Sequence, residues 1–373
     1  MINAKGIRGV SYFDCPGGGQ VVVDGTTAYI GHLKGPEATT IVDVSDPANP
    51  RQIAQLMCAH SGVHAHKVRV KNGLMLTNYE AKRYTGTPDP GFVGGLSVYD
   101  ISTPSDPRRI SFWPCAGSGI HRFTFDGRYA YISPEMEGYI GNIVLILDLQ
   151  DPAKPKEVGR WWVPGQWIAG GEEPTWEGNA YRCHHPIRRG NRLYVSYWKG
   201  GYFILDIEDM ANPKCIAGLD QRNVYPYPTH TVLPLPRRLQ GRDVMLVADE
   251  DVARPDDWPG AFMWLIDIED ETNPVPLSTF QLDHVDGSSR PPRSGCHQPV
   301  EEFEGTEIPV AWFSEGLRIV DVSNPHSPKE TAYFVPPVPE GEERVQSNDV
   351  CLDDRGLIYL IDRCRGLHIL ERE

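Results

Sequence analysis

The chain has 373 residues, of which 40% are hydrophobic, and it contains 37 glycines and 33 prolines. So many turn-forming residues favour short strands joined by turns over long helices. The formal net charge is −14, so we expect neither nucleic acid nor a membrane surface as a partner, because both are bound through clustered Lys and Arg. No stretch is apolar enough for a signal peptide or a membrane span, and the eight cysteines contain no CxxC pair. We therefore expect a cytoplasmic protein with reduced thiols.

One apolar pattern that ends in an acidic residue recurs along the chain. Its six strong copies lie at 40–43, 97–100, 145–148, 203–206, 264–267 and 318–321, and a weaker copy lies at 368–371. A turn rich in Asp, Asn and Pro follows each strong copy, and one more short strand follows the turn. Proline has no N–H to give to a strand ladder, so these segments must be turns. Repeats of about 50–60 residues with four strands each predict a β-propeller.

The seventh copy ends before its turn and its outer strand, which would leave one blade a strand short. Residues 5–15 resemble the outer strands of the other repeats, with apolar Ile7, Val10, Tyr12 and Phe13. Adding this segment to the last blade would join the chain ends and remove an exposed sheet edge. We therefore expect an all-β fold, with residues 1–373 forming a single seven-bladed β-propeller whose ring is closed by the N-terminal strand.

The repeat resembles the LVIVD-repeat family of propellers, through segments such as Ile41-Val42-Asp43-Val44 and Ile319-Val320-Asp321-Val322. This resemblance extends over nearly the whole chain and implies the propeller fold, whereas it implies no particular activity. More distantly, the arrangement is similar to the selenium-binding and methanethiol oxidase propellers, which are associated with copper.

Five consecutive repeats place a histidine at the start of the innermost strand. These candidate metal ligands are His66, His121, His184, His230 and His297, with His64 and His185 as neighbours and Asn348 at the same place in the last repeat. The innermost strands of a propeller line its axis, so these side chains can converge there. Neutral imidazoles that converge form a transition-metal site. The sequence leaves open whether His64 or His66, and His184 or His185, faces the axis, because a shift of one residue exchanges the two faces.

Counting back from the hairpin turns places a glutamate opposite each of four histidines. The expected pairs are His66 with Glu80, His121 with Glu135, His230 with Glu250 and His297 with Glu315. A carboxylate that accepts the outer N–H of an imidazole fixes the tautomer and makes the inner nitrogen a better ligand. The alternative is a structural polar network that fills the axis. Histidines backed by glutamates on a seven-bladed propeller are similar in architecture to the carotenoid-cleaving oxygenases, which hold ferrous iron; this likeness implies a type of site and no substrate.

Long loops at the histidine end of the strands carry aromatic residues. We expect Trp162, Trp167, Trp176, Tyr227 and Trp258 to form aromatic walls of a substrate pocket. The alternative is that they pack against neighbouring blades. Arg182, Lys199 and Arg363 lie near the same end and could bind a substrate carboxylate, with surface or ion-pair roles as the alternative. Cys183 and Cys296 are expected to pack between blades, because each adjoins a histidine and must point the other way.

These features favour a metal-dependent enzyme with a mononuclear, histidine-ligated site that acts on a small, partly aromatic or apolar molecule. Iron or copper with redox or oxygen chemistry is the first choice. Zinc or manganese in a hydrolase or lyase is the alternative, and a non-catalytic propeller that binds a protein is a third possibility. Neither a P-loop nor a GxGxxG motif opens a helix in this chain, so we expect no nucleotide cofactor.

Overall fold

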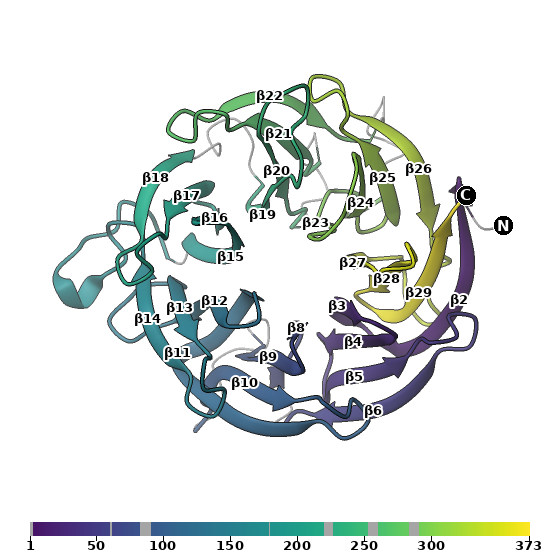
Figure 1. Cartoon of the computed structure of the whole chain (residues 1–373), viewed down its shortest axis with the longest axis horizontal. Coiled ribbons are helices and arrows are strands. Elements are labelled where there is room, and N and C mark those ends of the chain that lie inside the picture. Colours follow the sequence, from purple (N-terminus) through teal and green to yellow (C-terminus); the bar gives the residue numbers. More distant parts are fainter. Residues whose placement is uncertain are drawn as a thin grey trace.

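Antiparallel strands arranged around one axis make up nearly all the regular structure of the chain (Figure 1). This computed structural model describes residues 3–59, 62–82, 91–178, 180–219, 227–252, 260–282 and 291–373. Within these ranges the only helix is a 3-10 turn at Ile168–Gly170. No helix in the described part of the chain is long and apolar enough to cross a membrane. The expected all-β class is confirmed.

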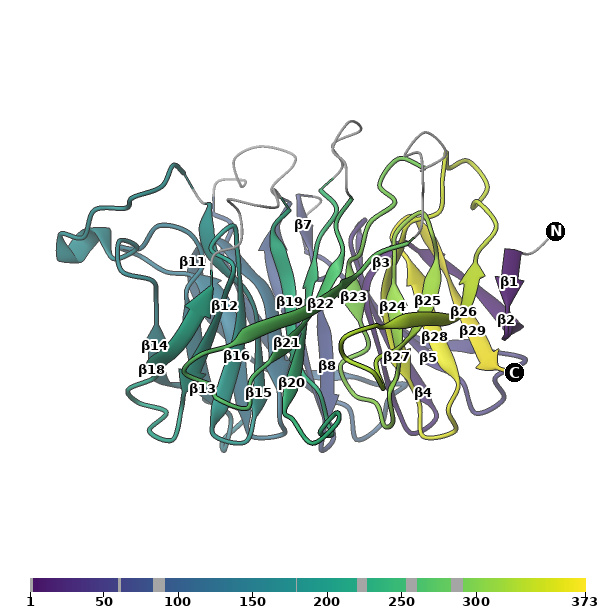
Figure 2. The ribbon, with the colours of Figure 1, turned by 90° about the horizontal axis from the view of Figure 1, so that it is seen from above.

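The strands form successive antiparallel groups, and in each group the pairing runs from the axis outward (Figures 1 and 2). The first group is β3 (Gly18–Asp24), β4 (Thr27–His32), β5 (Glu37–Asp43) and β6 (Arg51–Met57). The second is β7 (Val63–His64) and β8 (Val68–Lys71), then β9 (Leu74–Ala81), β10 (Gly94–Asp100) and the first part of β11 (Arg108–Phe125). The third is the rest of β11 with β12 (Tyr129–Glu135), β13 (Val144–Asp148) and β14 (Lys156–Trp161).

The same order continues to the end of the chain. The fourth group is β15 (Tyr181–Arg189), β16 (Arg192–Trp198), β17 (Tyr202–Asp206) and β18 (Lys214–Leu219). The next is β19 (Thr229–Pro234), β20 (Val244–Asp249), β21 (Met263–Asp267) and β22 (Val275–Phe280). Then come β23 (Gln298–Pro299), β24 (Glu307–Ala311), β25 (Leu317–Asp321) and β26 (Lys329–Val335), followed by β27 (Ser347–Leu352), β28 (Ile358–Asp362) and β29 (Arg365–Arg372).

The recurring apolar pattern forms the third strand of each group, and this strand is buried on both faces. In β5, Ile41 packs in a cluster with Val68 and Met75 of the second group, whereas Val42 packs with Tyr359 of the last group. A strand covered on both sides reads as a continuous apolar run instead of an alternating one. Packing between successive groups therefore explains the pattern.

The aspartate that ends the pattern holds the turn that follows it. Asp43 Oδ1 accepts the backbone N–H of Ser45 at 2.9 Å, and the same bond links Asp100 with Ser102 and the corresponding residues farther along the chain. A short carboxylate that binds the N–H two residues on is the standard Asx turn. The spacing of strand and turn that recurs along the chain thus follows from one local hydrogen bond.

The innermost strand is irregular at the same place in several groups. The register shifts lie between Gly18 and Gln20, Ile120 and Phe123, Tyr181 and His185, Thr229 and Thr231, and Ser347 and Asp349. A bulge of this kind inserts an extra residue and changes the direction of the neighbouring side chains. His121, His184 and His230 lie within three of these irregular stretches.

The start of the chain lies beside its end (Figure 1). Strand β2 (Ile7–Pro16) pairs antiparallel with β29, from Ile7 opposite Arg372 to Pro16 opposite Arg365. We expected one strand over residues 5–15, but the chain is divided at Gly6, whose φ is 63°. Ahead of that residue, β1 (Asn3–Lys5) pairs instead with β26 of the preceding group.

We predict that replacing Ile7 by alanine lowers the free energy of unfolding by about 2–5 kcal/mol, because it empties a packed site. Ile7 is only 4% exposed and packs with Ile308, Ala332 and Leu370. The control is Arg8→Ala on the same strand, whose side chain is 59% exposed and which should change the value by within about 0.5 kcal/mol. Guanidinium unfolding measures both. Equal effects of the two variants would mean that β2 does not dock.

Candidate metal centre

The five histidines that begin the inner strands lie in one continuous arc of contacting rings, here called the histidine arc. The ring centroids are 5.2 Å apart for His66 and His121, 4.7 Å for His121 and His184, 4.4 Å for His184 and His230, and 4.1 Å for His230 and His297. Four of the rings are buried, and the side chain of His121 is 22% exposed. The structure thus brings together all five predicted ligands.

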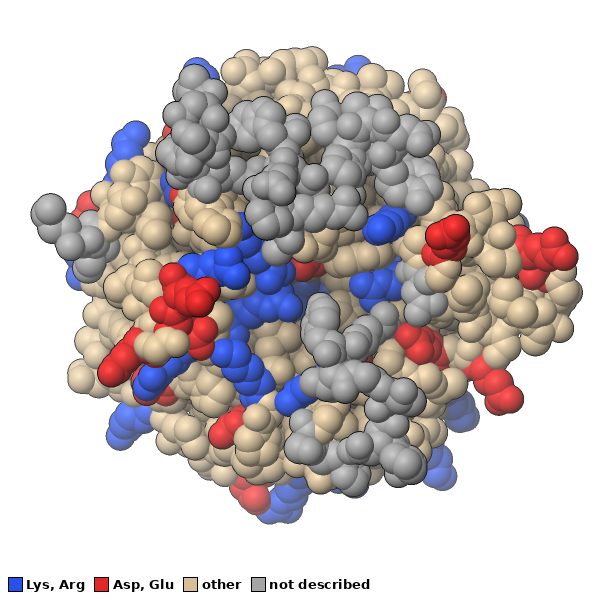
Figure 3. Space-filling model, turned by 180° about the vertical axis from the view of Figure 1, so that it is seen from behind, with Lys and Arg blue, Asp and Glu red and all other residues tan. Residues whose placement is uncertain are grey.

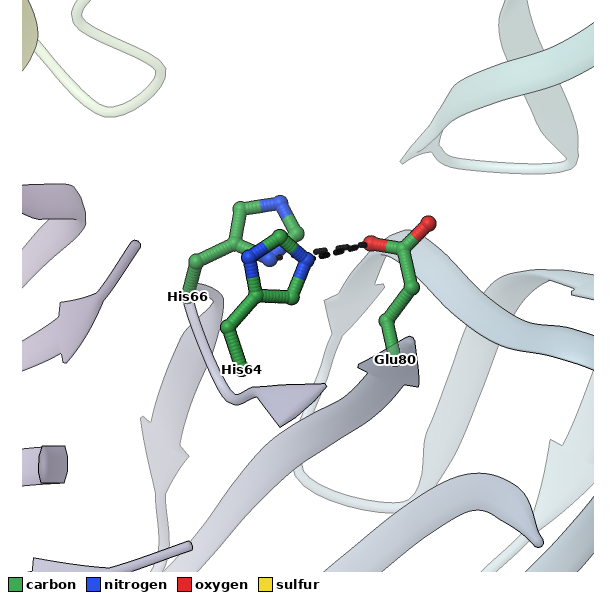
Figure 4. A group of neighbouring side chains, drawn as sticks. All are labelled: His64, His66 and Glu80. Atoms are coloured by element: carbon green, nitrogen blue, oxygen red, sulfur yellow. Dashed lines mark hydrogen bonds and ion pairs between the residues drawn. The ribbon is translucent and has the colours of Figure 1, made fainter. Parts of the chain in front are cut away.

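A single carboxylate, that of Glu80, serves one end of the arc (Figure 4). Its Oε2 lies 3.1 Å from His64 Nε2, 3.7 Å from His66 Nδ1 and 3.0 Å from His121 Nδ1. The residue opposite Glu80 in the sheet is His64, so the expected pairing with His66 was wrong. Both His64 and His66 reach the carboxylate, and both are buried. Because Gly119 of β11 also pairs with Glu80, this glutamate is brought to His121 of the next group.

Two of the other expected histidine–glutamate pairs are also wrong. Glu135 lies opposite Ala116, and its carboxylate accepts the backbone N–H and the hydroxyl of Ser118 at 2.9 and 2.8 Å. Glu315 lies in the turn after β24, where its carboxylate accepts hydrogen bonds from Ser294 and Arg318. Counting from the hairpin turns assumed a regular ladder, whereas bulges displace the register.

Glu250 does lie near the histidine that was expected to face it. One ligand atom each of His184, His230 and Glu250 lie within 4.8 Å of one another, as do those of His64, His66 and Glu80. Two three-ligand groups therefore lie along the arc, each of two histidines and one carboxylate. His121 lies between them, with Nδ1 toward Glu80 and Nε2 toward His184.

Hydrogen bonds fix the tautomers of three rings. His184 Nδ1–H donates to the carbonyl oxygen of His230 at 2.9 Å, and His297 Nδ1–H donates to the carbonyl oxygen of Asn348. A carbonyl only accepts, so each of these rings carries its proton on Nδ1. His121 Nδ1–H likewise donates to the Glu80 carboxylate at 3.0 Å. In the neutral form of each of these rings, Nε2 therefore keeps its lone pair.

The Nε2 atoms of His121 and His184 are only 3.0 Å apart. Burial lowers the pKa of His184 well below its ordinary value, and the nearby His121, Arg122 and Arg182 lower it further. Burial does the same for His66, His230 and His297, with Arg363 contributing at His297. Neutral imidazoles are the form that binds metals.

A second set of polar residues, here called the charged layer, lies one residue farther along the inner strands. It comprises Lys67, Arg122, His185 and Asp349, together with Glu301, and all of these except the partly exposed Glu301 are buried. Arg122 Nη2 donates to Glu301 at 3.1 Å and lies 4.0 Å from Asp349, and its Nη1 donates to His230 Nε2 at 3.4 Å. His185 points to this layer, 3.6 Å from Glu301, so His184 is the residue that joins the arc.

Burial dominates the titration of the charged layer. It raises the pKa of Asp349 to about 6, and it lowers the pKa of Lys67 well below its ordinary value. Burial would also raise the pKa of Glu301, but Arg69 and Arg122 outweigh it and hold that pKa low. Of these residues, only His185 was among the candidates predicted from the sequence. The sequence does carry a signal for the others, because charged residues inside otherwise apolar strands are rare without partners.

Within the described residues, the tryptophans predicted to form aromatic walls contact one another or a neighbouring tyrosine. Trp162 and Trp167 pack on each other at 5.7 Å, and Trp176 stacks on Tyr181 at 4.4 Å. Tyr227 is buried, and Trp258 lies outside the described residues.

The rings that do contact the arc were not predicted. Trp198 lies 5.1 Å from His184, and Phe313 lies 4.4 Å from His297.

The cations and cysteines are placed as follows. Arg182 lies over the Trp198 ring at 4.4 Å, and Lys199 follows Trp198 in the same turn. Arg363 lies in the turn between β28 and β29.

Cys183 and Cys296 pack in hydrophobic clusters, as expected, and burial raises the pKa of both thiols well above the ordinary value.

Comparison with known proteins supports the fold and gives no activity. The LVIVD repeat model matches residues 19–57, 189–217 and 309–334. A search of curated proteins finds no match.

Solved structures with similar folds include two β-propeller domains and the protein Sqt1. The WD40 β-propeller domain of Doa1 has a TM-score of 0.61 at 8% identity and covers 99% of this chain and 97% of its own. The β-propeller domain of Cps50 (Swd1) from Myceliophteria thermophila has a TM-score of 0.60 at 12% identity and covers 99% of both chains. Sqt1 of Saccharomyces cerevisiae has a TM-score of 0.59 at 9% identity and covers 94% of this chain and 82% of its own. At such identities these likenesses concern the fold alone. The chain therefore carries LVIVD repeats and has a β-propeller fold.

Proposed function

We propose that this chain is a metal-dependent enzyme whose metal ion is bound in the histidine arc, by His121, His184, His230 and Glu250. The observation that carries this proposal is the pair of Nε2 atoms of His121 and His184 at 3.0 Å. Each of these rings donates its Nδ1–H to an oxygen that accepts, so two lone pairs face each other. Two lone pairs at this distance repel unless a cation lies against both.

A proton on His121 is the simplest other cation, because the Glu80 carboxylate 3.0 Å from its Nδ1 would stabilise that imidazolium, whereas burial disfavours one at His184. The guanidinium of Arg122, 3.4 Å from His230 Nε2, adds a positive charge close by. A metal ion bound by several neutral ligands spreads its charge over all of them, and ligand nitrogens about 3 Å apart suit adjacent positions around an ion with bonds of about 2.1 Å.

The ligand types favour iron with redox or oxygen chemistry. Two histidines and one carboxylate, the composition of the group His184, His230 and Glu250, is the set used by non-haem iron oxygenases. Such a centre would supply electron transfer to or from a bound small molecule. Within this site, Glu80 would hold His121 in the ligand tautomer, and Trp198 would cover one side of His184.

Zinc or manganese in a hydrolase or lyase is the second candidate, and the carboxylate of Glu250 in the group with His184 and His230 is the observation that favours it. Hard oxygen ligands suit these ions as well as iron, whereas copper favours nitrogen and sulfur. We expect no nucleotide cofactor in either case.

We further propose that the antiparallel groups form seven blades in one ring, with β2 completing the last blade. The pairing of β2 with β29 supports this arrangement, as does the order in which each group pairs from the axis outward. A closed ring holds the inner strands in fixed positions, which a metal site built from several blades requires.

We predict about one iron or copper ion per chain in purified, tag-free protein, bound through the imidazoles of the arc. The double variant His121→Ala, His184→Ala should lose the metal, whereas His326→Ala, at an exposed residue, should keep it. Plasma mass spectrometry measures the content, and circular dichroism checks the fold. One zinc or manganese ion would favour the hydrolase or lyase. No metal after reconstitution would contradict the proposal and leave a protein-binding propeller.

We predict that Glu80→Gln weakens metal binding by about 10–100-fold, the usual effect of losing a carboxylate that orients a ligating imidazole. Glutamine keeps the shape of the side chain but loses the charge that accepts the proton of His121. The matched control is Glu135→Gln, because that carboxylate binds Ser118. Competition titration with a chelator measures both affinities, and equal values for the two variants would contradict the role given to Glu80.

A further inference from the structure

Two stacks of the same composition rise from the histidine arc toward its open end. In one, Trp198 lies against His184 with ring centroids 5.1 Å apart, and the Arg182 guanidinium lies 4.4 Å from the Trp198 ring centroid. In the other, Phe313 lies against His297 at 4.4 Å, and the Arg293 guanidinium lies 4.0 Å from the Phe313 centroid. Each stack thus runs from imidazole to aromatic ring to guanidinium, a favourable arrangement for the cation.

The backbone is strained at these aromatic residues. Trp198 has a φ of 52° and Phe313 a φ of 37°, and Arg293 has a φ of 60°. Bulky residues rarely adopt positive φ, and such strain is kept where the surrounding structure requires it, often at functional sites. The strain directs both aromatic rings onto the histidines instead of into the sheet.

A third blade carries a cation at the position of these aromatic residues. The ladders pair Ser196 with Tyr202, Ala311 with Leu317 and Ile361 with Leu367, so the turns align. Two residues beyond the first member of each pair stand Trp198, Phe313 and Arg363.

A glycine with positive φ follows three residues after each of them, namely Gly201, Gly316 and Gly366. Arg363 therefore stands at the matching sequence position of its turn, without the positive φ of Trp198 and Phe313.

Lys and Arg side chains gather about the hollowed middle of this face, although the chain has a net charge of −14 (Figure 3). Nearby carboxylates are already used: Glu250 accepts from Arg293 at 3.2 Å and Glu315 accepts from Arg318 at 2.8 Å. Within the described residues, no ion pair joins Lys199 or Arg363 to an acidic side chain. Lys199 and Arg363 are therefore cations that no carboxylate in the described part of the chain neutralises at this end of the arc.

We propose that the molecule acted on at this site carries an anionic group, a carboxylate or a phosphate. Arg182, Lys199 and Arg363 bind this group, while its aromatic or apolar body lies against Trp198 and Phe313. Charge-assisted hydrogen bonds from guanidinium are the strong and geometrically selective way to bind such anions. Arg293 holds Glu250 and positions that carboxylate. Any reaction of the bound molecule depends on the proposed metal centre, whereas binding of its anionic group depends only on the cations.

The test is calorimetry of metal-loaded protein with three probes of similar size: benzoate, phenyl phosphate and benzamide. We expect at least one anion to bind about tenfold or more tightly than neutral benzamide, with weaker binding at higher salt. Benzoate and phenyl phosphate separate a carboxylate from a phosphate. The double variant Arg182→Gln, Arg363→Gln should lose about tenfold or more in affinity for the favoured anion at unchanged metal content.

The control is Arg128→Gln, whose partner Asp148 lies at the far end of the strands; this variant should bind the anion as the wild type does. Equal binding of benzamide, no binding of any probe, or full binding by the double variant would overturn the proposal. Protein that holds no metal but still prefers the anion would overturn the proposed metal centre and leave the anion site standing. Protein that holds metal without preferring an anion would do the reverse.

Discussion

The bulge near the start of the inner strand is the constraint on which the centre depends. In a regular strand, successive side chains point to opposite sides, so two neighbouring residues could not both point toward the axis. The register shift between Tyr181 and His185 lets two successive residues reach other groups: His184 contacts His121, while His185 approaches Glu301. The shift between Thr229 and Thr231 does the same for His230, which contacts His297, and for Thr231, which donates to Gln298. A repeated irregularity thus builds two layers from one strand position.

The histidine arc consists of imidazoles, whereas the charged layer contains acidic and basic side chains. The charged layer places Arg122 against Glu301 and Asp349 of other groups, and Lys67 Nζ donates to the carbonyl oxygen of Gly19 at 2.8 Å. Buried ion pairs add little net stability, yet breaking one leaves an unpaired charge that costs several kcal/mol, about 3–5. The layer therefore holds the inner strands in one arrangement. Through Arg122 it also places a fixed positive charge 3.4 Å from His230, which limits how much further positive charge the arc can take.

The sequence predicted what depends on local pattern and missed what depends on bulges and contacts between groups. The third strands, their turns and the five arc histidines follow from periodicity that each repeat carries by itself. The partner of His121 could not be found in this way, because Glu80 belongs to the preceding group and reaches it through pairing with Gly119. Counting along a regular hairpin gave Glu135 instead, because the pairing of β11 with β12 contains two register shifts that such a count leaves out. The aromatic residues Trp198 and Phe313 were missed because their direction depends on strained backbone.

Repetition also explains how one site can have unlike sides. The turns after β16 and β24 share one geometry, with positive φ at Trp198 and Phe313 and at the glycine three residues on. Arg363 stands at the matching sequence position after β28, where Gly366 has a positive φ and Arg363 does not. Two aromatic side chains and one cation therefore stand at matching positions beside an arc of imidazoles. The repeats supply equivalent positions, and the differences between them give this end of the arc unlike sides.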